Sequence, residues 1–307
     1  MAPKRLVRNA AVGLGAVLAG NRLLRCSPET LAPPLARTQQ TYEWQHRDIA
    51  YTEAGNPDAP DLVLLHAPEL PRSSHEFRYV IDALSETYHV FAPDLPGFGR
   101  SAQLPEAYDP EGYSGFLQSF LADLTEQPTV VAASLTAAYA VVAGTDADAA
   151  TDIDEYVLIC PTTTAPQTTR RLAPAYSLPA VGEALRNVTM SKPMLRYRFG
   201  TDGFVESSAM TAEWLRYSWR ASHRQGGHRL LAARAAGRLD SDVDLGSVLS
   251  KAATPTTLLW GREADSPPVA AGRRLATAAD ARLVVFENAA TLPHAEHPEP
   301  FVELFDA

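Results

Sequence analysis

Short apolar runs recur along the chain and are separated by stretches with helical patterns. A continuous apolar run bounded by Pro, Gly or Asp is typical of a strand that is buried on both faces of a parallel sheet. Runs of this kind lie at 61–68, 89–97, 128–134, 155–161, 255–261 and 281–288. Helical patterns lie at 76–85, 110–124, 135–144, 269–279 and 298–305. The alternation predicts an α/β fold whose mostly parallel sheet is covered by helices on both faces.

This alternation stops between residues 162 and 250, where prolines, tyrosines and helical stretches replace the apolar runs. A helical insertion between two strands lies over the carboxyl ends of the sheet, where ligands bind in open α/β folds. We therefore expect a core made of 41–161 and 251–307, an inserted helical cap at 162–250, and a leader at 1–40.

The leader has a basic start and a short apolar stretch, followed by Arg22 and Arg25. The stretch is short for a membrane-spanning helix, and the small-residue cleavage site of a signal peptide is poor. We expect a cytoplasmic protein that is not exported. The arginines also fit a helix lying on a membrane surface, so weak membrane contact through this segment is the alternative. Whether residues 1–26 are cleaved or bind a membrane stays open.

Composition narrows the possible functions. The net charge of -9 excludes the basic surface that nucleic-acid binding requires. Only Lys4, Lys192 and Lys251 are lysines, a balance that fits a salt-rich cytoplasm and also arginine-rich mesophiles. Cys26 and Cys160 cannot form a disulfide framework, and Cys160 lies in an apolar run, as a buried thiol would. No CxxC or HExxH spacing occurs, so we expect neither a metal nor a cofactor.

Four motifs occur in a distinctive order: LLHAP at 64–68, APDLPGFGRSA at 92–102, LLWGREAD at 258–265 and LPHAEHPEPF at 292–301. The Gly-Phe-Gly of the second motif lacks the third glycine of a phosphate-binding loop and follows a proline. In this order the motifs resemble the α/β-hydrolase superfamily, specifically its single-domain members with a helical cap. The resemblance extends from Tyr51 to Phe305.

The resemblance implies a serine nucleophile on a strained strand-to-helix turn, flanked by small residues two positions away on each side. Ser134 occupies this position, with Ala132 and Thr136 where glycines usually stand. A strand pattern precedes it and an alanine-rich helix pattern follows. Ser134 is therefore the candidate nucleophile.

The other members of the implied triad are ambiguous. Thr291 falls where the family has its histidine, and threonine cannot act as a base. His294 is the nearest substitute, three residues later and within ~10 Å along the chain, and His297 is a further one. A structural role for His294 is the competing interpretation. For the orienting acid, Asp265 is preferred over Glu263, and a solvated acidic loop is the alternative.

The oxyanion hole also departs from the family. The Leu135 N–H is available as one donor, but Pro68 occupies the position of the second and has no N–H. Either the Glu69 N–H or the His75 side chain could substitute. His66 is interpreted as a packing residue.

These features predict a serine hydrolase, esterase-like, that acts on a small apolar acyl or ester substrate. Cap tyrosines together with Met210, Trp214 and Trp219 would supply apolar pocket surface. Because Thr291 and Pro68 lie in separate loops, a catalytically silent binding protein is the alternative. Acyl transfer or lyase chemistry using His223 or His228 is a third option, since the fold alone does not decide. The sequence decides neither the natural substrate nor the oligomeric state.

Overall fold

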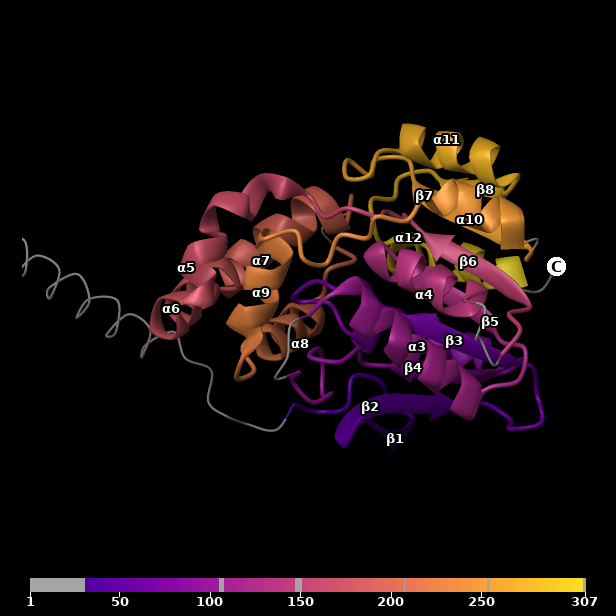
Figure 1. The fold of residues 1–307 in the computed structure, drawn as a ribbon, viewed down its shortest axis with the longest axis horizontal. Coiled ribbons are helices and arrows are strands. Elements are labelled where there is room, and N and C mark those ends of the chain that lie inside the picture. Colours follow the sequence, from indigo (N-terminus) through magenta and orange to yellow (C-terminus); the bar gives the residue numbers. More distant parts are fainter. Residues whose placement is uncertain (1–30, 105–107, 147–150, 207, 253, 306–307) are drawn as a thin grey trace, which may run out of the picture.

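An eight-stranded sheet forms the centre of the protein (Figure 1). The computed structural model describes residues 31–104, 108–146, 151–206, 208–252 and 254–305. The strands lie in the order β1-β2-β4-β3-β5-β6-β7-β8. Their bounds are β1 Thr38–Trp44, β2 Arg47–Ala54, β3 Asp61–Leu65, β4 His89–Pro93, β5 Thr129–Ala133, β6 Glu155–Ile159, β7 Thr256–Gly261 and β8 Arg282–Phe286. Strands β3 to β8 pair in parallel, which confirms the predicted fold class.

Helices connect the strands and cover the sheet. Between β3 and β6 lie η1 Ser74–Phe77, α2 Ile81–Leu84, α3 Pro110–Leu124 and α4 Leu135–Thr145. Between β6 and β7 lie η2 Gln167–Leu172, α5 Ala173–Ser177, α6 Pro179–Thr189, α7 Lys192–Arg198, η3 Phe199–Gly203, α8 Ala212–Ser222, α9 Gly227–Ala235 and α10 Leu245–Ala252. The remaining helices are α11 Val269–Ala279, α12 Pro293–Glu296, α13 Pro298–Val302 and η4 Glu303–Phe305.

The two faces of the sheet are buried in separate apolar clusters, because successive side chains of a strand point to opposite faces. Val63 and Leu65 of β3 pack with residues of α3, α4 and α10 on one face. Leu62 and Leu64 pack on the other face with residues of η1, α2 and α13. Continuous apolar strands are therefore required, and this explains why the sequence shows runs rather than alternation.

The hairpin β1–β2 lies at the sheet edge and was not predicted. It pairs antiparallel in register from Thr38 with Glu53 to Trp44 with Arg47. The expected leader boundary at residue 40 falls inside β1. Leu35, which precedes the hairpin, is 3% exposed and packs in the second apolar cluster. The part of the leader before residue 31 lies outside the described residues.

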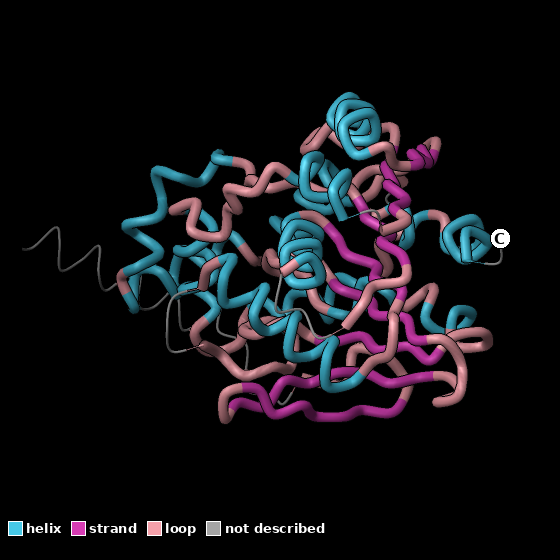
Figure 2. The backbone as a smooth tube through the Cα atoms, turned by 45° about the vertical axis from the view of Figure 1, so that its right-hand side comes forward, coloured by secondary structure: helices cyan, strands magenta, loops and turns pink. Residues whose placement is uncertain are grey.

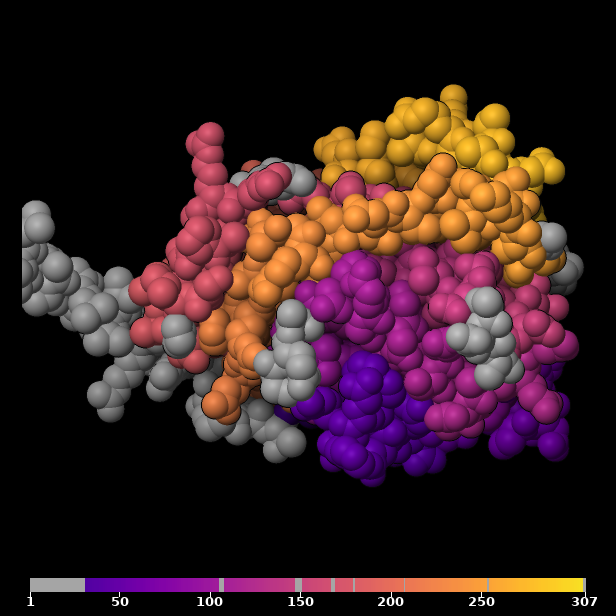
Figure 3. Space-filling model, in the orientation of Figure 1, coloured from indigo at the N-terminus to yellow at the C-terminus, as the bar shows by residue number. Residues whose placement is uncertain are grey.

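Helices α5 to α9 gather beyond one end of the sheet, whereas α10 lies beside the sheet strands (Figures 1 and 2). In the space-filling view, this helical segment forms one end of the molecule, next to the strands of the core (Figure 3). The cap boundaries of 162 and 250 stay a prediction. Among the described helices, none combines the length and the apolar character needed to cross a membrane.

Candidate active site

Ser134 lies at the turn between β5 and α4, with φ 57° and ψ −128°. A residue with a side chain adopts such a conformation at a cost of ~1–3 kcal/mol, so neighbouring structure must hold it. The end of β6 does so. The Ser134 N–H donates to the Ile159 carbonyl at 2.9 Å, and the Thr162 N–H donates to the Ser134 carbonyl at 3.3 Å. The sharp turn with positive φ expected for a nucleophile is present.

The turn accepts Thr136 in place of the usual glycine because the threonine side chain makes a buried hydrogen bond. Its buried hydroxyl donates to the His66 carbonyl at 2.7 Å and so links α4 to the end of β3. Among the described residues, the His66 ring forms hydrogen bonds only with backbone atoms: Nδ1 with the Ala67 carbonyl, and Nε2 with the Leu95 N–H. Burial lowers the pKa of His66 to about 4, so the ring is neutral and serves packing.

The Ser134 side chain lines a cavity of about 540 Å³ between the sheet and the helices that follow β6. Part of the wall is apolar, from Leu70, Met190, Leu195, Phe199, Leu231 and Leu292. Of the aromatic cap residues that were expected here, only Tyr176 is on this wall. Trp214 instead packs in the interior of the helical segment, against Phe199 and Phe204.

His294, the expected base, lies in the core rather than on the cavity wall. Its ring is 0% exposed, packs near Phe77 and Phe301, and neither ring nitrogen has a hydrogen-bond partner among the described residues. Nε2 is 4.0 Å from Oε1 of Glu76, which is too long for a hydrogen bond. Burial, together with nearby Arg72, lowers the pKa of His294 to about 3.

The expected acids are also separate from His294. Asp265 is exposed and contacts Pro268 through an isolated bridge, whereas the Glu263 carboxylate accepts the Ala289 N–H at 3.1 Å. Among the described residues, no hydrogen bond joins Ser134, His294 and Asp265. The described conformation therefore does not bring these three residues together as a triad.

One of the two expected oxyanion donors is available. Leu135 begins α4, and among the described residues its N–H has no hydrogen-bond partner. The Glu69 N–H instead donates to the Ala67 carbonyl at 2.9 Å, because the turn at Pro68 closes on itself. The His75 ring stacks on Tyr217 with centroids 4.1 Å apart, and it too is absent from the cavity wall. This leaves one backbone donor beside Ser134.

Within the described part of the chain, no histidine lines the cavity. His223 bonds to the Trp219 carbonyl through Nδ1, and His228 is buried in α9. His297 bonds to the Asn288 carbonyl. The alternative in which a cap histidine assists Ser134 therefore has no contact to support it in this conformation.

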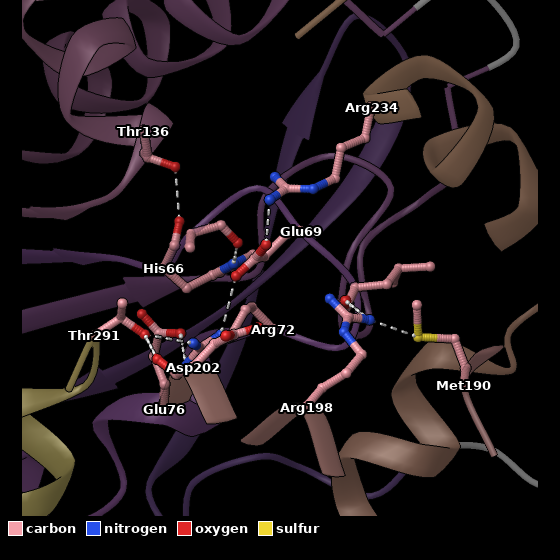
Figure 4. A network of polar contacts seen from close by, with 12 residues as sticks. His66, Glu69, Arg72, Glu76, Thr136, Met190, Arg198, Asp202, Arg234 and Thr291 are labelled. Atoms are coloured by element: carbon pink, nitrogen blue, oxygen red, sulfur yellow. Dashed lines mark hydrogen bonds and ion pairs between the residues drawn. The ribbon is translucent and has the colours of Figure 1, made fainter. Parts of the chain in front are cut away.

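Three arginines on the wall are the feature that the sequence did not reveal (Figure 4). Arg72 follows β3, whereas Arg198 and Arg234 come from α7 and α9. Glu69 lies between two of them, 2.5 Å from Arg234 and 3.5 Å from Arg72. Such a set carries no motif, because its members are far apart in sequence and meet only through the fold.

The position where the family has its histidine lies on the same wall. Thr291 lines the cavity, and its hydroxyl donates to the Asp202 carbonyl at 2.6 Å. The Arg72 guanidinium donates to the same hydroxyl at 3.4 Å. A hydroxyl held between a carbonyl and a guanidinium positions neighbouring groups but cannot take a proton from Ser134.

The two glutamates of the wall differ in protonation. Burial opposes ionisation of Glu69, but Arg234, Arg72 and Arg198 outweigh it and lower the pKa to about 2. Burial of Glu76 raises its pKa to about 8, although Arg72 lies 3.8 Å away. At neutral pH, Glu76 is therefore uncharged, and its contact with Arg72 is not a pairing of opposite charges.

Other chemistry at the wall is limited. Cys160 is buried as predicted, and burial raises the pKa of its thiol to about 12, so it is not a competing nucleophile. Across the described ranges, no cluster of three or more His, Cys, Asp or Glu side chains could hold a metal ion.

Known proteins match the sequence of this chain over short segments. A haloalkane dehalogenase of Bradyrhizobium diazoefficiens is 38% identical over 89 residues, which cover 29% of this chain and 27% of the relative. Epoxide hydrolase A of Mycobacterium tuberculosis is 33% identical over 98 residues, covering 31% and 30% respectively. The match thus spans less than a third of the length of these curated relatives.

Solved structures match over far more of the chain. An esterase from Rhodococcus superimposes with a TM-score of 0.68 at 19% identity, covering 88% of this chain and 96% of the esterase. The epoxide hydrolase CorEH gives a TM-score of 0.70 at 18% identity, covering 87% and 96%. At these identities the likeness shows the fold alone. The model of the alpha/beta hydrolase family matches residues 62–304, so the protein belongs to the alpha/beta hydrolase family.

Proposed function

We propose that this protein is a serine hydrolase that cleaves an ester bond in a small substrate with an apolar acyl part. The observation that carries the proposal is Ser134, which a strained strand-to-helix turn holds on the wall of the cavity. Such a turn exposes the hydroxyl to a substrate carbonyl. The Leu135 N–H would stabilise the oxyanion, and Met190 and Leu231 would contact the acyl chain.

The proton acceptor has two candidates. His294 is the base expected from the sequence, and its use requires the ring to turn out of the core toward the cavity. Glu76 already lines the cavity, and its pKa of about 8 suits a base at mildly alkaline pH. Asp265 could orient His294 only after the same rearrangement.

A fluorophosphonate probe tests the nucleophile. The probe needs an activated serine and not the natural substrate, so the wild type should become labelled and Ser134→Ala should not. Ser119→Ala, in α3 and away from the cavity wall, is the matched control and should label like the wild type. Labelling that survives Ser134→Ala would contradict the proposal.

Hydrolysis of short p-nitrophenyl esters distinguishes the bases. If His294 is the base, His294→Ala removes activity and Glu76→Gln retains it; if Glu76 is the base, the results are reversed. General-base catalysis contributes ~10²–10⁴-fold, so either loss is measurable. Thr291→His should raise the rate if the family position is the better one. Activity that persists in both His294→Ala and Glu76→Gln would exclude both candidates.

A second candidate function is ligand binding without turnover. The observation that favours it is that no histidine in the described residues lines the cavity, while Pro68 removes an oxyanion donor. Absence of probe labelling across pH 6–9 and in molar salt would favour this binding function over the hydrolase.

A further inference from the structure

The cavity wall carries more positive than negative charge. Arg72, Arg198 and Arg234 line it, and a guanidinium stays protonated in proteins. Two other side chains on the wall supply negative charge at neutral pH: half-buried Glu69, and Asp202, which is exposed to solvent. Glu76 is uncharged there because burial raises its pKa to about 8. Among the described lining residues, the balance is therefore one positive charge in surplus.

Two guanidinium groups on this wall retain unused donors. Nη1 of Arg72 and Nη1 of Arg234 are buried and have no hydrogen-bond partner among the described residues. Buried donors of this kind are rare unless a water or a ligand satisfies them. Both arginines are nevertheless held in place, because each contacts Glu69.

Arg198 is the guanidinium with the weakest partners. Its Nη1 reaches the Leu70 carbonyl at 3.4 Å and the Met190 sulfur at 3.5 Å. No carboxylate among the described residues lies within ion-pair distance of it. In Figure 4, Arg198 approaches from the side opposite Thr291 and ends near Met190. A half-buried charged group that contacts a carbonyl and a thioether is suited to an anionic partner.

We propose that the ligand of this cavity carries a carboxylate, recognised by Arg198 together with the unused donors of Arg72 and Arg234. The planar fork of a guanidinium matches a carboxylate with two parallel hydrogen bonds. The single surplus charge fits a monoanion better than a phosphate dianion. Met190 and Leu231 on the same wall fit an apolar chain attached to the anion. The class is therefore an amphipathic carboxylic acid, which, resting on the proposed function, is the acid product of ester hydrolysis.

Calorimetric binding of hexanoate and of hexanamide tests the anion separately from catalysis, using full-length Ser134→Ala protein. Hexanoate should bind at least about tenfold more tightly than the neutral amide, because one charge-assisted contact corresponds to a tenfold change or more. Arg198→Met should remove that preference, and Arg198→Lys should retain part of it. Arg196→Met, on the exposed face of α7 and away from the wall, should bind like its parent.

The outcomes separate the two proposals. A preference for hexanoate in a protein that hydrolyses no ester would uphold the anion site and overturn the hydrolase. Ester hydrolysis with equal binding of hexanoate and hexanamide would overturn the anion site alone. Tighter binding of hexyl phosphate than of hexanoate would overturn the assignment to a carboxylate. If Arg198→Met does not fold, the preference of the parent protein and the Arg198→Lys variant still decide.

Discussion

Two titratable side chains face each other between the cavity and the core, and both are uncharged at neutral pH. Glu76 and His294 lie 4.0 Å apart, and burial raises the pKa of the first to about 8 and lowers that of the second to about 3. Arg72 and Glu69 are the charged neighbours of Glu76. Burial thus prevents the ion pair that the proximity of an acid and a base suggests.

Glu76 should make stability depend on pH. Its pKa of about 8 in the folded protein exceeds the ordinary 4.5, so folding takes up a proton between these values. Its stabilising effect is complete below pH 4.5 and is lost as the pH rises toward 8, by up to ~1.4 kcal/mol per pH unit. Urea unfolding should show Glu76→Gln gaining stability over the wild type by up to about 4 kcal/mol between pH 5 and 8.

Exposed Glu86 provides the control for that experiment. Unfolding free energies of Glu86→Gln and the wild type should follow parallel curves over the same range of pH. Parallel curves for Glu76→Gln as well would mean that the Glu76 carboxyl is ionised in the folded protein.

Residue-level prediction succeeded where local chain geometry decides the outcome. The strand and the small residues before Ser134 are adjacent in sequence, so the turn could be read directly from the pattern. The grouping of Arg72, Arg198 and Arg234 on the cavity wall could not be predicted from the sequence, because three separate parts of the chain bring these side chains together. The orientation of His294 likewise depends on packing against Phe77 and Phe301, which local spacing does not encode.

At the scale of elements, the parallel strands and most core helices were predicted, but the hairpin β1–β2 was not. Its two-residue turn uses Gln45 and His46, both with positive φ, instead of the Asn-Gly or Asp-Gly pair that signals such a turn. Its strands lie at the sheet edge and carry mixed polar residues, so no continuous apolar run marks them. The helix expected at 76–85 is likewise broken, into η1 and α2.

The segment before this hairpin should contribute to stability. Leu35 is 3% exposed and packs against the sheet, and truncating a buried leucine costs ~2–5 kcal/mol. Leu35→Ala should therefore lower the melting temperature by many degrees in calorimetry. Leu178→Ala, at a leucine that is 56% exposed, should change it little. Equal small effects would show that residues before β1 are not part of the packed core.

On the scale of the whole molecule, buried neutral histidines should make the fold sensitive to acid. Burial lowers the pKa values of His66, His75 and His294 to about 4, 3 and 3. These rings stay neutral when folded and become protonated when unfolded below pH 6.5. Their stabilising effect is present above pH 6.5 and is lost as the pH falls toward 4, by up to ~1.4 kcal/mol per histidine and pH unit.

Single variants separate the acid sensitivity caused by the histidines from the pH dependence caused by Glu76. Protonation of Glu76 stabilises the folded protein as the pH falls, whereas protonation of the histidines in the unfolded chain destabilises it. His75→Phe keeps the aromatic stack on Tyr217 and removes one proton-binding site. Its unfolding free energy should vary less steeply with pH between 4.5 and 6.5, by ~1 kcal/mol per unit. His46→Phe, at a side chain that is 98% exposed, should leave the slope unchanged. An unaltered slope in both variants would indicate that His75 is protonated in the folded protein.

The arginines of the cavity wall also bear on how a catalytic cycle ends. If the protein hydrolyses esters as proposed, cleavage converts an uncharged ester group into a free acid that ionises beside Ser134. The acid product thus carries more negative charge than the acyl group from which it formed, and it forms on the wall that holds Arg72, Arg198 and Arg234. The arginines then retain the acid product more strongly than the uncharged ester. Departure of the acid, rather than bond cleavage, would limit turnover.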